Sequence, residues 1–246
     1  MDCPRGALGS GGSRWLPVRY PALYAGEVFA GFARGHDIAL TPASEIALPP
    51  QAAPIAIHKS LSLHRMMQEM LRFSTNITAE AAGMTATKER TGQMRGLRTS
   101  ALGMSQWAKK RAGIAPSFAD HSGLGDTSRL SAADMVTLLN ADGVEAVLNP
   151  ILKVIPMRDA DWRVMTDHPA RVVAKTGTLN FVSALAGYIR TASGRKLTFA
   201  IFAADLEARE IGKASNEERP TGSVTFNTNA KRLQNKLLLR WAALNN

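Results

Sequence analysis

Three consecutive segments with the composition of β-strands dominate the last third of this sequence. They span 171–177, 182–191 and 196–204, and the turn 192–195 joins the last two as a hairpin. Their apolar residues fall on both faces, which is typical of a sheet covered by helices on both sides. An amphipathic helix is predicted over 227–244. Antiparallel strands followed by such a helix predict an α+β fold.

Helical periodicity dominates the sequence before the strands. The clearest helix runs from Leu63 to about Phe73, because apolar residues recur on one face and Ser60 or Ser62 can cap its start. A short apolar stretch follows and is predicted to break at Gly83. Further helices are predicted from Pro21 to before Gly35, from Leu97 to about Arg111, from Ser131 to about Leu139, and from Val144 to Leu152.

These patterns predict one substantial folded domain preceded by a less regular lead. Residues 1–19 are expected to be unstructured, residues 20–57 to form a helix and a proline-rich connector, and residues 58–246 to form the folded domain. The lead has no apolar core of the kind that a secretory signal needs, and no stretch is apolar enough to predict a transmembrane segment. The single cysteine, Cys3, has no partner for a disulfide or for a cysteine metal site.

The chain is strongly basic, with a formal charge of +10. Residues 51–112 alone hold ten basic and three acidic residues. Such a balance favours attraction to an anionic polymer, which includes nucleic acid, a membrane surface and cell-wall material. No zinc-finger spacing, basic zipper or aromatic-rich RNA-binding signature accompanies the charge, so no nucleic-acid partner is predicted.

The tripeptide Lys175-Thr176-Gly177 lies in the first predicted strand, which continues into Thr178 and Leu179. A lysine on a strand offers a fixed cation, and the threonine hydroxyl adds a hydrogen bond. Glycine leaves room for a peptide substrate to lie against the strand as an added β-strand. The three residues together suit the binding of a terminal carboxylate.

Ser74-Thr75-Asn76 has the form Ser-x-Asn and follows directly after the clearest helix. There the hydroxyl can relay a proton and the amide can orient a peptide bond, although a serine at this place also serves as a simple cap. About a hundred residues separate it from Lys175-Thr176-Gly177. Ser-x-Asn followed by Lys-Thr-Gly on a strand is the motif order of β-lactamases and penicillin-binding proteins.

Three segments carry a resemblance to one family of these proteins: residues 63–82, Asp120-His121-Ser122-Gly123-Leu124, and residues 174–178. Together they resemble the class C, low-molecular-mass penicillin-binding proteins, which are D-alanyl-D-alanine carboxypeptidases and endopeptidases acting on peptidoglycan. The resemblance covers roughly residues 20–244. It implies the β-lactamase/transpeptidase-like fold, with residues 20–57 as a remnant of an inserted region and the sheet incomplete at its N-terminal side.

The resemblance also implies a role for each matching residue. Ser74 would pass a proton between a catalytic lysine and the leaving D-alanine nitrogen, and Asn76 would bind the penultimate amide of the substrate. Lys175 and Thr176 would hold the terminal carboxylate beside Gly177, and the backbone N–H of Thr178 would form part of the oxyanion hole. Ser122 and Gly123 would line the site, although both also suit a simple turn. The implied partners are peptidoglycan stem peptides and β-lactams, with no cofactor and no metal.

One family motif has no counterpart before Ser74. The acylating serine of this family belongs to a Ser-x-x-Lys motif near the start of the protein. The sequence contains that pattern only once, at Ser193-Gly194-Arg195-Lys196, where a hairpin turn is predicted and Gly194 opposes a helix. We therefore expect no nucleophile in this chain, and a truncated reading frame or a split gene would account for that.

Several functional alternatives remain open from the sequence. The chain is expected to be a fragment of a serine-type carboxypeptidase that is inactive by itself, or a cell-wall-binding remnant without catalysis. A β-lactamase would need an additional carboxylate to activate water, and the sequence does not place one. The resemblance implies action in the periplasm, although the sequence shows no signal peptide.

Overall fold

The computed structural model describes residues 18–46, 51, 53–93, 95–215 and 217–246. The chain divides into two compact units, residues 1–59 and 60–246. The predicted unstructured lead lies outside the described residues except for Val18 and Arg19. In the first unit, helix α1 (Pro21–Arg34) begins with a proline at its first position, as predicted. Gly26 lies close to Ala43 of the extended segment that follows α1.

The second unit begins with three helices, α2 (Leu63–Phe73), α3 (Asn76–Thr91) and α4 (Leu97–Ala112). The Ser62 hydroxyl accepts a hydrogen bond from the Arg65 amide, which confirms the predicted start of α2. The predicted break at Gly83 is wrong, because α3 runs through this residue without interruption. A side chain at Gly83 would overlap the His121 ring, so the glycine permits a close approach rather than ending the helix.

Two short helices, α5 (Ala132–Leu139) and α6 (Val144–Leu148), connect α4 to the sheet. The Ser131 hydroxyl accepts a hydrogen bond from the Asp134 amide, as the capping pattern predicted. Helix α6 ends four residues earlier than the predicted end at Leu152. Asn149 still has helical backbone angles, but Pro150 after it has no backbone N–H and cannot continue the helical hydrogen bonds, which is consistent with the early end.

The sheet has four antiparallel strands in the order β1-β2-β3-β4: β1 (Lys153–Ile155), β2 (Arg171–Leu179), β3 (Val182–Arg190) and β4 (Lys196–Ala204). The three predicted strands are confirmed, whereas β1 was not predicted. In the register of the two longest pairings, Ala174 lies opposite Gly187 and Ala186 lies opposite Ala200. Helix α7 (Leu206–Ala214), also not predicted, follows β4 and precedes the last helix.

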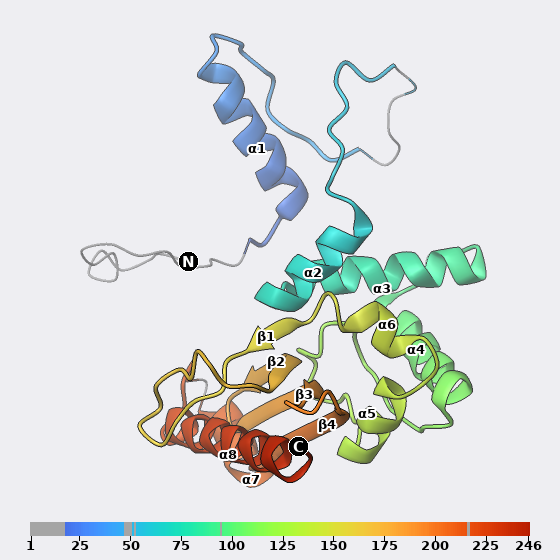
Figure 1. Cartoon of the computed structure of the whole chain (residues 1–246). Helices are drawn as coiled ribbons and strands as arrows, with labels where there is room; N and C mark the ends of the chain where they lie inside the picture. The colour runs from blue at the N-terminus through green and yellow to red at the C-terminus, as the bar shows by residue number, and fades with distance from the viewer. Residues whose placement is uncertain (1–17, 47–50, 52, 94, 216) are drawn as a thin grey trace. The chain divides into compact units, whose positions relative to one another are not determined.

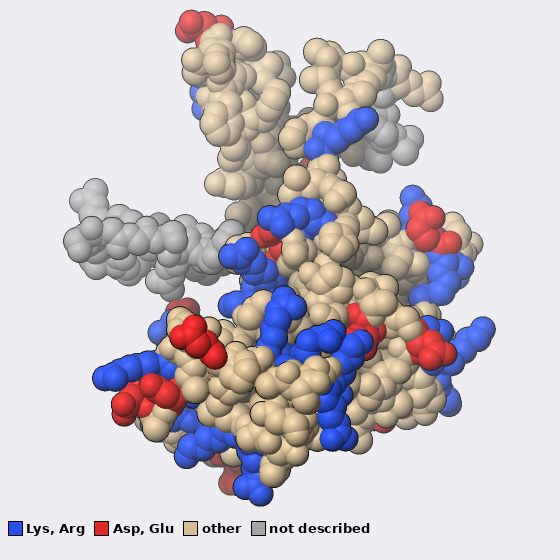
Figure 2. Space-filling view, viewed as in Figure 1, with Lys and Arg blue, Asp and Glu red and all other residues tan. Residues whose placement is uncertain are grey.

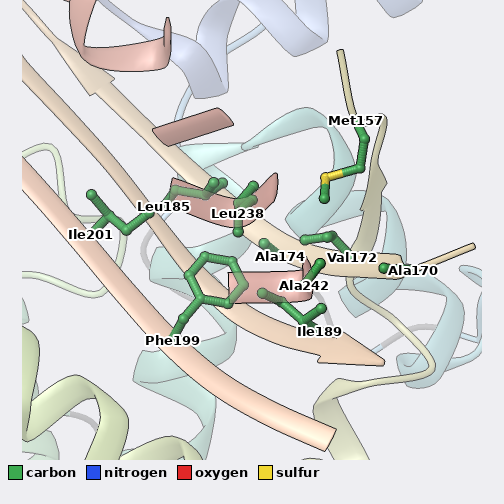
Figure 3. Packing of buried hydrophobic residues seen from close by; sticks show 10 residues of the cluster. All are labelled: Met157, Ala170, Val172, Ala174, Leu185, Ile189, Phe199, Ile201, Leu238 and Ala242. Carbon is green, nitrogen blue, oxygen red and sulfur yellow. The ribbon is translucent and has the colours of Figure 1, made fainter. Parts of the chain in front are cut away.

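Helix α8 (Ser223–Leu244) packs along one face of the sheet (Figure 1). Leu238 and Ala242 of this helix are buried against strand residues such as Val172, Ile189 and Phe199 (Figure 3). The Phe199 and Trp241 rings lie 6.1 Å apart in a tilted arrangement. The predicted α+β class with helices on an antiparallel sheet is therefore confirmed.

Candidate active site

Ser74 lies in the tight connection between α2 and α3. Its backbone is in the left-handed conformation, with φ 55° and ψ 48°, and it forms the C-terminal cap of α2. A non-glycine residue rarely adopts this conformation, so the turn is specified by its surroundings. The connection is so short that Asn76 is already the first residue of α3. Ser74 and Asn76 are thereby held at the adjoining ends of two helices.

Lys175 reaches this turn from strand β2. Its Nζ donates a hydrogen bond to Ser74 Oγ at 2.6 Å and a second one to the carbonyl oxygen of Thr176. Burial lowers the pKa of the Lys175 ammonium from its usual value of 10.5, and the positive charge of Lys153 lowers it further. None of the ion pairs among the described residues involves Lys175. The ammonium is therefore available to an anionic ligand.

These residues line a cleft of about 760 Å³ between the sheet and the helices of the second unit. All of the site residues predicted from the sequence contribute to it: Ser74, Asn76, Ser122, Gly123, Lys175, Thr176, Gly177 and Thr178. Other parts of the wall are apolar and come from α5, α6, the connection between α6 and β1, β3 and β4: Met135, Leu139, Leu148, Leu152, Val182, Ala184, Ala186 and Phe202. The cleft thus combines hydrogen-bonding groups with an extended apolar surface.

Strand β2 presents an open edge inside this site. Strand β1 pairs with β2 only from Val172 to Ala174. On that side, residues 175–179 pair with no strand among the residues that the structure describes, and Thr176, Gly177 and Thr178 are exposed. An extended peptide can add to such an edge through main-chain hydrogen bonds.

The loop that carries Ser122 and Gly123 is organised by the Asp120 carboxylate. Asp120 is largely buried and accepts hydrogen bonds from the backbone amides of Gly123 and Gly125. The Ser122 and Ser128 hydroxyls also donate to this carboxylate, each at 3.4 Å. Gly123 has a positive φ of 75°, which favours glycine at this turn. The loop is therefore a specified structure and more than a simple connection.

Two residues that contribute to the site, Glu80 and His121, were not predicted from the sequence. Glu80 of α3 accepts hydrogen bonds from the backbone amides of His121 and Ser122. The His121 ring lines the cleft, and its Nε2 lies 2.8 Å from Ser100 Oγ. A usable signal existed in the sequence, because Glu80 lies one helical turn after Asn76 and therefore on the same side of α3.

The only Ser-x-x-Lys sequence lies away from the cleft. Ser193 is in the β3–β4 turn, where its hydroxyl lies 2.9 Å from Thr191 Oγ1 and also donates to the carbonyl oxygen of Asn245. Lys196 forms a salt bridge of 2.9 Å with Glu145. Neither residue lines the cleft. Within the described residues, no group of three histidine, cysteine or acidic side chains could hold a metal ion.

Solved structures show the same fold. One of them is penicillin-binding protein 4 (dacB) from Haemophilus influenzae, complexed with a β-lactam. The similarity has a TM-score of 0.62 and 22% sequence identity, and it covers 91% of this chain and 52% of the Haemophilus chain. A second structure of this Haemophilus protein gives a TM-score of 0.60 at 21% identity, covering 87% of this chain and 48% of the other. The α+β arrangement described above is therefore also the fold of this Haemophilus protein.

Two curated relatives agree with this assignment. Carboxypeptidase DacB of Mycolicibacterium smegmatis is 28% identical over 82% of this chain and 44% of its own length. Carboxypeptidase Rv3627c of Mycobacterium tuberculosis is 29% identical over 87% of this chain and 46% of its own length. The chain thus spans less than half the length of these relatives. The family model "D-Ala-D-Ala carboxypeptidase 3 (S13) family" matches residues 6–223, and the chain belongs to this family.

Proposed function

We propose that this chain supplies the carboxylate-binding and proton-relay part of a serine-type D-alanyl-D-alanine carboxypeptidase or endopeptidase that acts on peptidoglycan peptides. The observation that carries the proposal is the 2.6 Å hydrogen bond between Lys175 Nζ and Ser74 Oγ. These residues are 101 positions apart in the sequence. Their contact gives the cleft a hydroxyl and a cation at one point, which suits both a proton relay and the binding of an anionic group.

The geometry supports a specific pose for a peptide ending in D-alanyl-D-alanine. The peptide would add to the open edge of β2, with its terminal carboxylate near the Lys175 ammonium and the Thr176 hydroxyl. The backbone N–H of Thr178 would face the scissile carbonyl oxygen as one donor of an oxyanion hole. Asn76 would bind the penultimate amide, and Ser74 would relay the proton to the leaving nitrogen.

The proposal includes no acylation by this chain alone. Without a Ser-x-x-Lys motif in the cleft, binding and electrostatic stabilisation remain, and these are much weaker than the full catalytic effect of a nucleophile and its base. β-Lactams and stem peptides are then non-covalent ligands here. Because peptidoglycan lies outside the cytoplasmic membrane, the corresponding compartment is the periplasm. Among the described helices, none is long and apolar enough to cross a membrane.

Two probes test this function together: a fluorescent penicillin for covalent labelling, and an N-acetylated peptide ending in D-Ala-D-Ala for binding measured by ¹⁵N NMR titration. We expect peptide binding without covalent labelling. The variant Lys175→Met should weaken peptide binding by about tenfold or more, since a hydrogen bond to a charged group contributes about 1.5–3 kcal/mol. The matched control is Lys231→Met, which removes an exposed lysine of α8 and should leave binding unchanged.

Each outcome separates the alternatives. Covalent labelling by penicillin would show that the chain contains its own nucleophile. Peptide binding that is the same in Lys175→Met and the unchanged chain would remove the carboxylate-binding role of Lys175.

A cell-wall-binding remnant is the second candidate, and the basic side chains scattered over the visible face support it (Figure 2). It would be retained on peptidoglycan at low salt and released by added salt. The free peptide should then not reduce the retention on peptidoglycan, and Lys175→Met should leave it unchanged. Both results together would favour this candidate over the peptidase fragment.

A further inference from the structure

Glu80 connects the two polar walls of the cleft. It lies on α3, the helix that begins at Asn76, two residues after Ser74. Its Oε2 accepts a hydrogen bond from the His121 amide and its Oε1 accepts one from the Ser122 amide, both at 3.1 Å. One carboxylate thus holds two consecutive backbone N–H groups of the loop whose residues Ser122 and Gly123 also line the cleft. Hydrogen bonds from backbone amides to a carboxylate are stronger than those between neutral groups.

A second set of contacts holds the same loop against α3. The His121 Nε2 lies 2.8 Å from Ser100 Oγ, and Ser100 Oγ lies 2.6 Å from Thr87 Oγ1. Ser100 and Thr87 are buried. The His121 ring packs so closely on Gly83 that a Cβ at this position would overlap it. The backbone of His121 is therefore fixed to α3, and its imidazole is fixed both to Gly83 of α3 and to Ser100 of α4.

We propose that Glu80 is a positioning residue of the cleft, which fixes the distance between the Ser74–Asn76 turn and the loop that presents Ser122 and Gly123 to the ligand. This inference rests on the proposed function, because the ligand is the peptide that binds along β2. Glu80 itself does not line the cleft. It acts through the two amides, so the loop is already ordered before the ligand arrives and its ordering entropy is not lost on binding.

The variant Glu80→Gln tests this role with almost no change in side-chain size. An amide has one acceptor oxygen, so it can serve only one of the two N–H groups and places its own NH₂ donor against the other. We expect amide hydrogen exchange at His121 and Ser122 to become at least tenfold faster in this variant. The Gly123 amide, which donates to Asp120 at 3.0 Å, is the internal reference.

The affinity for the N-acetylated D-Ala-D-Ala peptide distinguishes a positioning role from a merely structural one. We expect about tenfold weaker binding in Glu80→Gln, since one hydrogen bond to a charged group is lost. The control is Glu89→Gln, an exposed glutamate on the same helix. The control should bind as tightly as the unchanged chain. The unfolding midpoint of each variant is measured alongside, and affinities are compared only between folded samples.

Three results would overturn the proposal. Unchanged peptide affinity in Glu80→Gln together with faster exchange would mean that Glu80 stabilises the loop without serving the ligand, while the proposed function would stand. Rapid exchange of the His121 and Ser122 amides in the unchanged chain would show that their hydrogen bonds to the Glu80 carboxylate do not form. This measurement tests the role of Glu80 even if the variant does not fold. No peptide binding by the unchanged chain would overturn the proposed function and the role of Glu80 with it.

Discussion

The two faces of the sheet are built differently although the same strands form both. On the face covered by α8, ten buried residues form one continuous cluster, which includes Leu185, Ile189 and Leu238 (Figure 3). On the opposite face, the cluster of buried residues contains only Leu139, Val173 and Tyr188. Beside this small cluster the apolar side chains of β3 and β4 line the cleft.

This difference follows from the alternation of side chains along the strands. In β3, Leu185 and Ile189 point toward α8, whereas Ala184 and Ala186 point toward the cleft. At these positions of β3, large side chains fill the first face and small ones leave room on the second. We infer that the α8 face provides most of the stability of the sheet. The cleft face is less densely packed, which leaves Lys175 accessible to a ligand.

The largest expected effect comes from comparing the α8 face with the lining of the cleft. The substitution Leu238→Ala removes a side chain that is 1% exposed in the α8 core and should lower the free energy of unfolding by about 2–5 kcal/mol. The substitution Leu124→Ala removes a leucine that lines the cleft and is 58% exposed, and it should change stability by no more than about 0.5 kcal/mol. Urea denaturation followed by circular dichroism measures both.

This pair of variants can break the comparison. Equal losses of stability at the two leucines would mean that the loop lining the cleft contributes to folding as much as the α8 face. A small loss at Leu238 would mean that α8 is not part of the cooperative core, and a difference in denaturant slope would then be expected as well.

The sequence predicted the elements whose hydrophobic pattern is long and regular. The strands β2, β3 and β4 and the helices α1, α2, α4, α5 and α8 were expected close to their observed bounds. Their patterns extend over eight residues or more, so local periodicity was sufficient. The same reasoning selected Ser74 and Lys175, because a motif order gave their spacing a chemical meaning. The predicted roles of these residues remain predictions.

The elements that were missed depend on tertiary contacts. Strand β1 has only three residues, and it is defined by pairing with Val172–Ala174 rather than by its own composition. The glycine at position 83 of α3 is explained by the close approach of the His121 ring, which is 38 positions away in the sequence. Glu80 was missed because its two partners are backbone amides, which cannot be recognised from the sequence, although its position one helical turn after Asn76 was a usable signal.

A smaller loss of stability is expected from removing a hydrogen bond within the cleft-side cluster, which is the cluster of Leu139, Val173 and Tyr188. The Tyr188 hydroxyl donates to the carbonyl oxygen of Leu139 at 2.9 Å and so connects β3 to the end of α5. Burial raises the pKa of this phenol to about 12, so the donor proton is present at neutral pH. Tyr188→Phe should lower the free energy of unfolding by about 1–2 kcal/mol, because a buried carbonyl loses its partner.

The matched control for this variant is Tyr24→Phe, which removes an exposed phenol hydroxyl from α1 and should change stability very little. If Tyr188→Phe also leaves the urea midpoint unchanged, the cleft-side cluster does not depend on its connection to α5. In that case the contrast between the faces would be sharper than proposed.

The smallest expected effect is a pH dependence at the edge of the cleft. Burial lowers the pKa of the His121 imidazole below its usual value of 6.5, and this outweighs the carboxylates of Glu80 and Asp120, which favour the charged form. As the pH falls below 6.5, the unfolded chain therefore binds a proton that the folded chain does not, and the free energy of unfolding decreases. The decrease ends once the pH is below the lowered pKa of the folded state.

An NMR titration of the His121 ring protons measures this pKa directly, and urea denaturation at pH 7.5 and pH 5 measures its consequence. In His121→Gln, the decrease in the free energy of unfolding between pH 7.5 and pH 5 should become smaller by the contribution of this imidazole. The control is His64→Gln, which changes an exposed histidine of α2 and should show the same decrease as the unchanged chain. A pKa above 6.5 would show that Glu80 and Asp120 outweigh burial. The charged imidazole would then stabilise the loop at low pH. Its contribution to the free energy of unfolding would increase as the pH falls, which is the opposite of the expected sign.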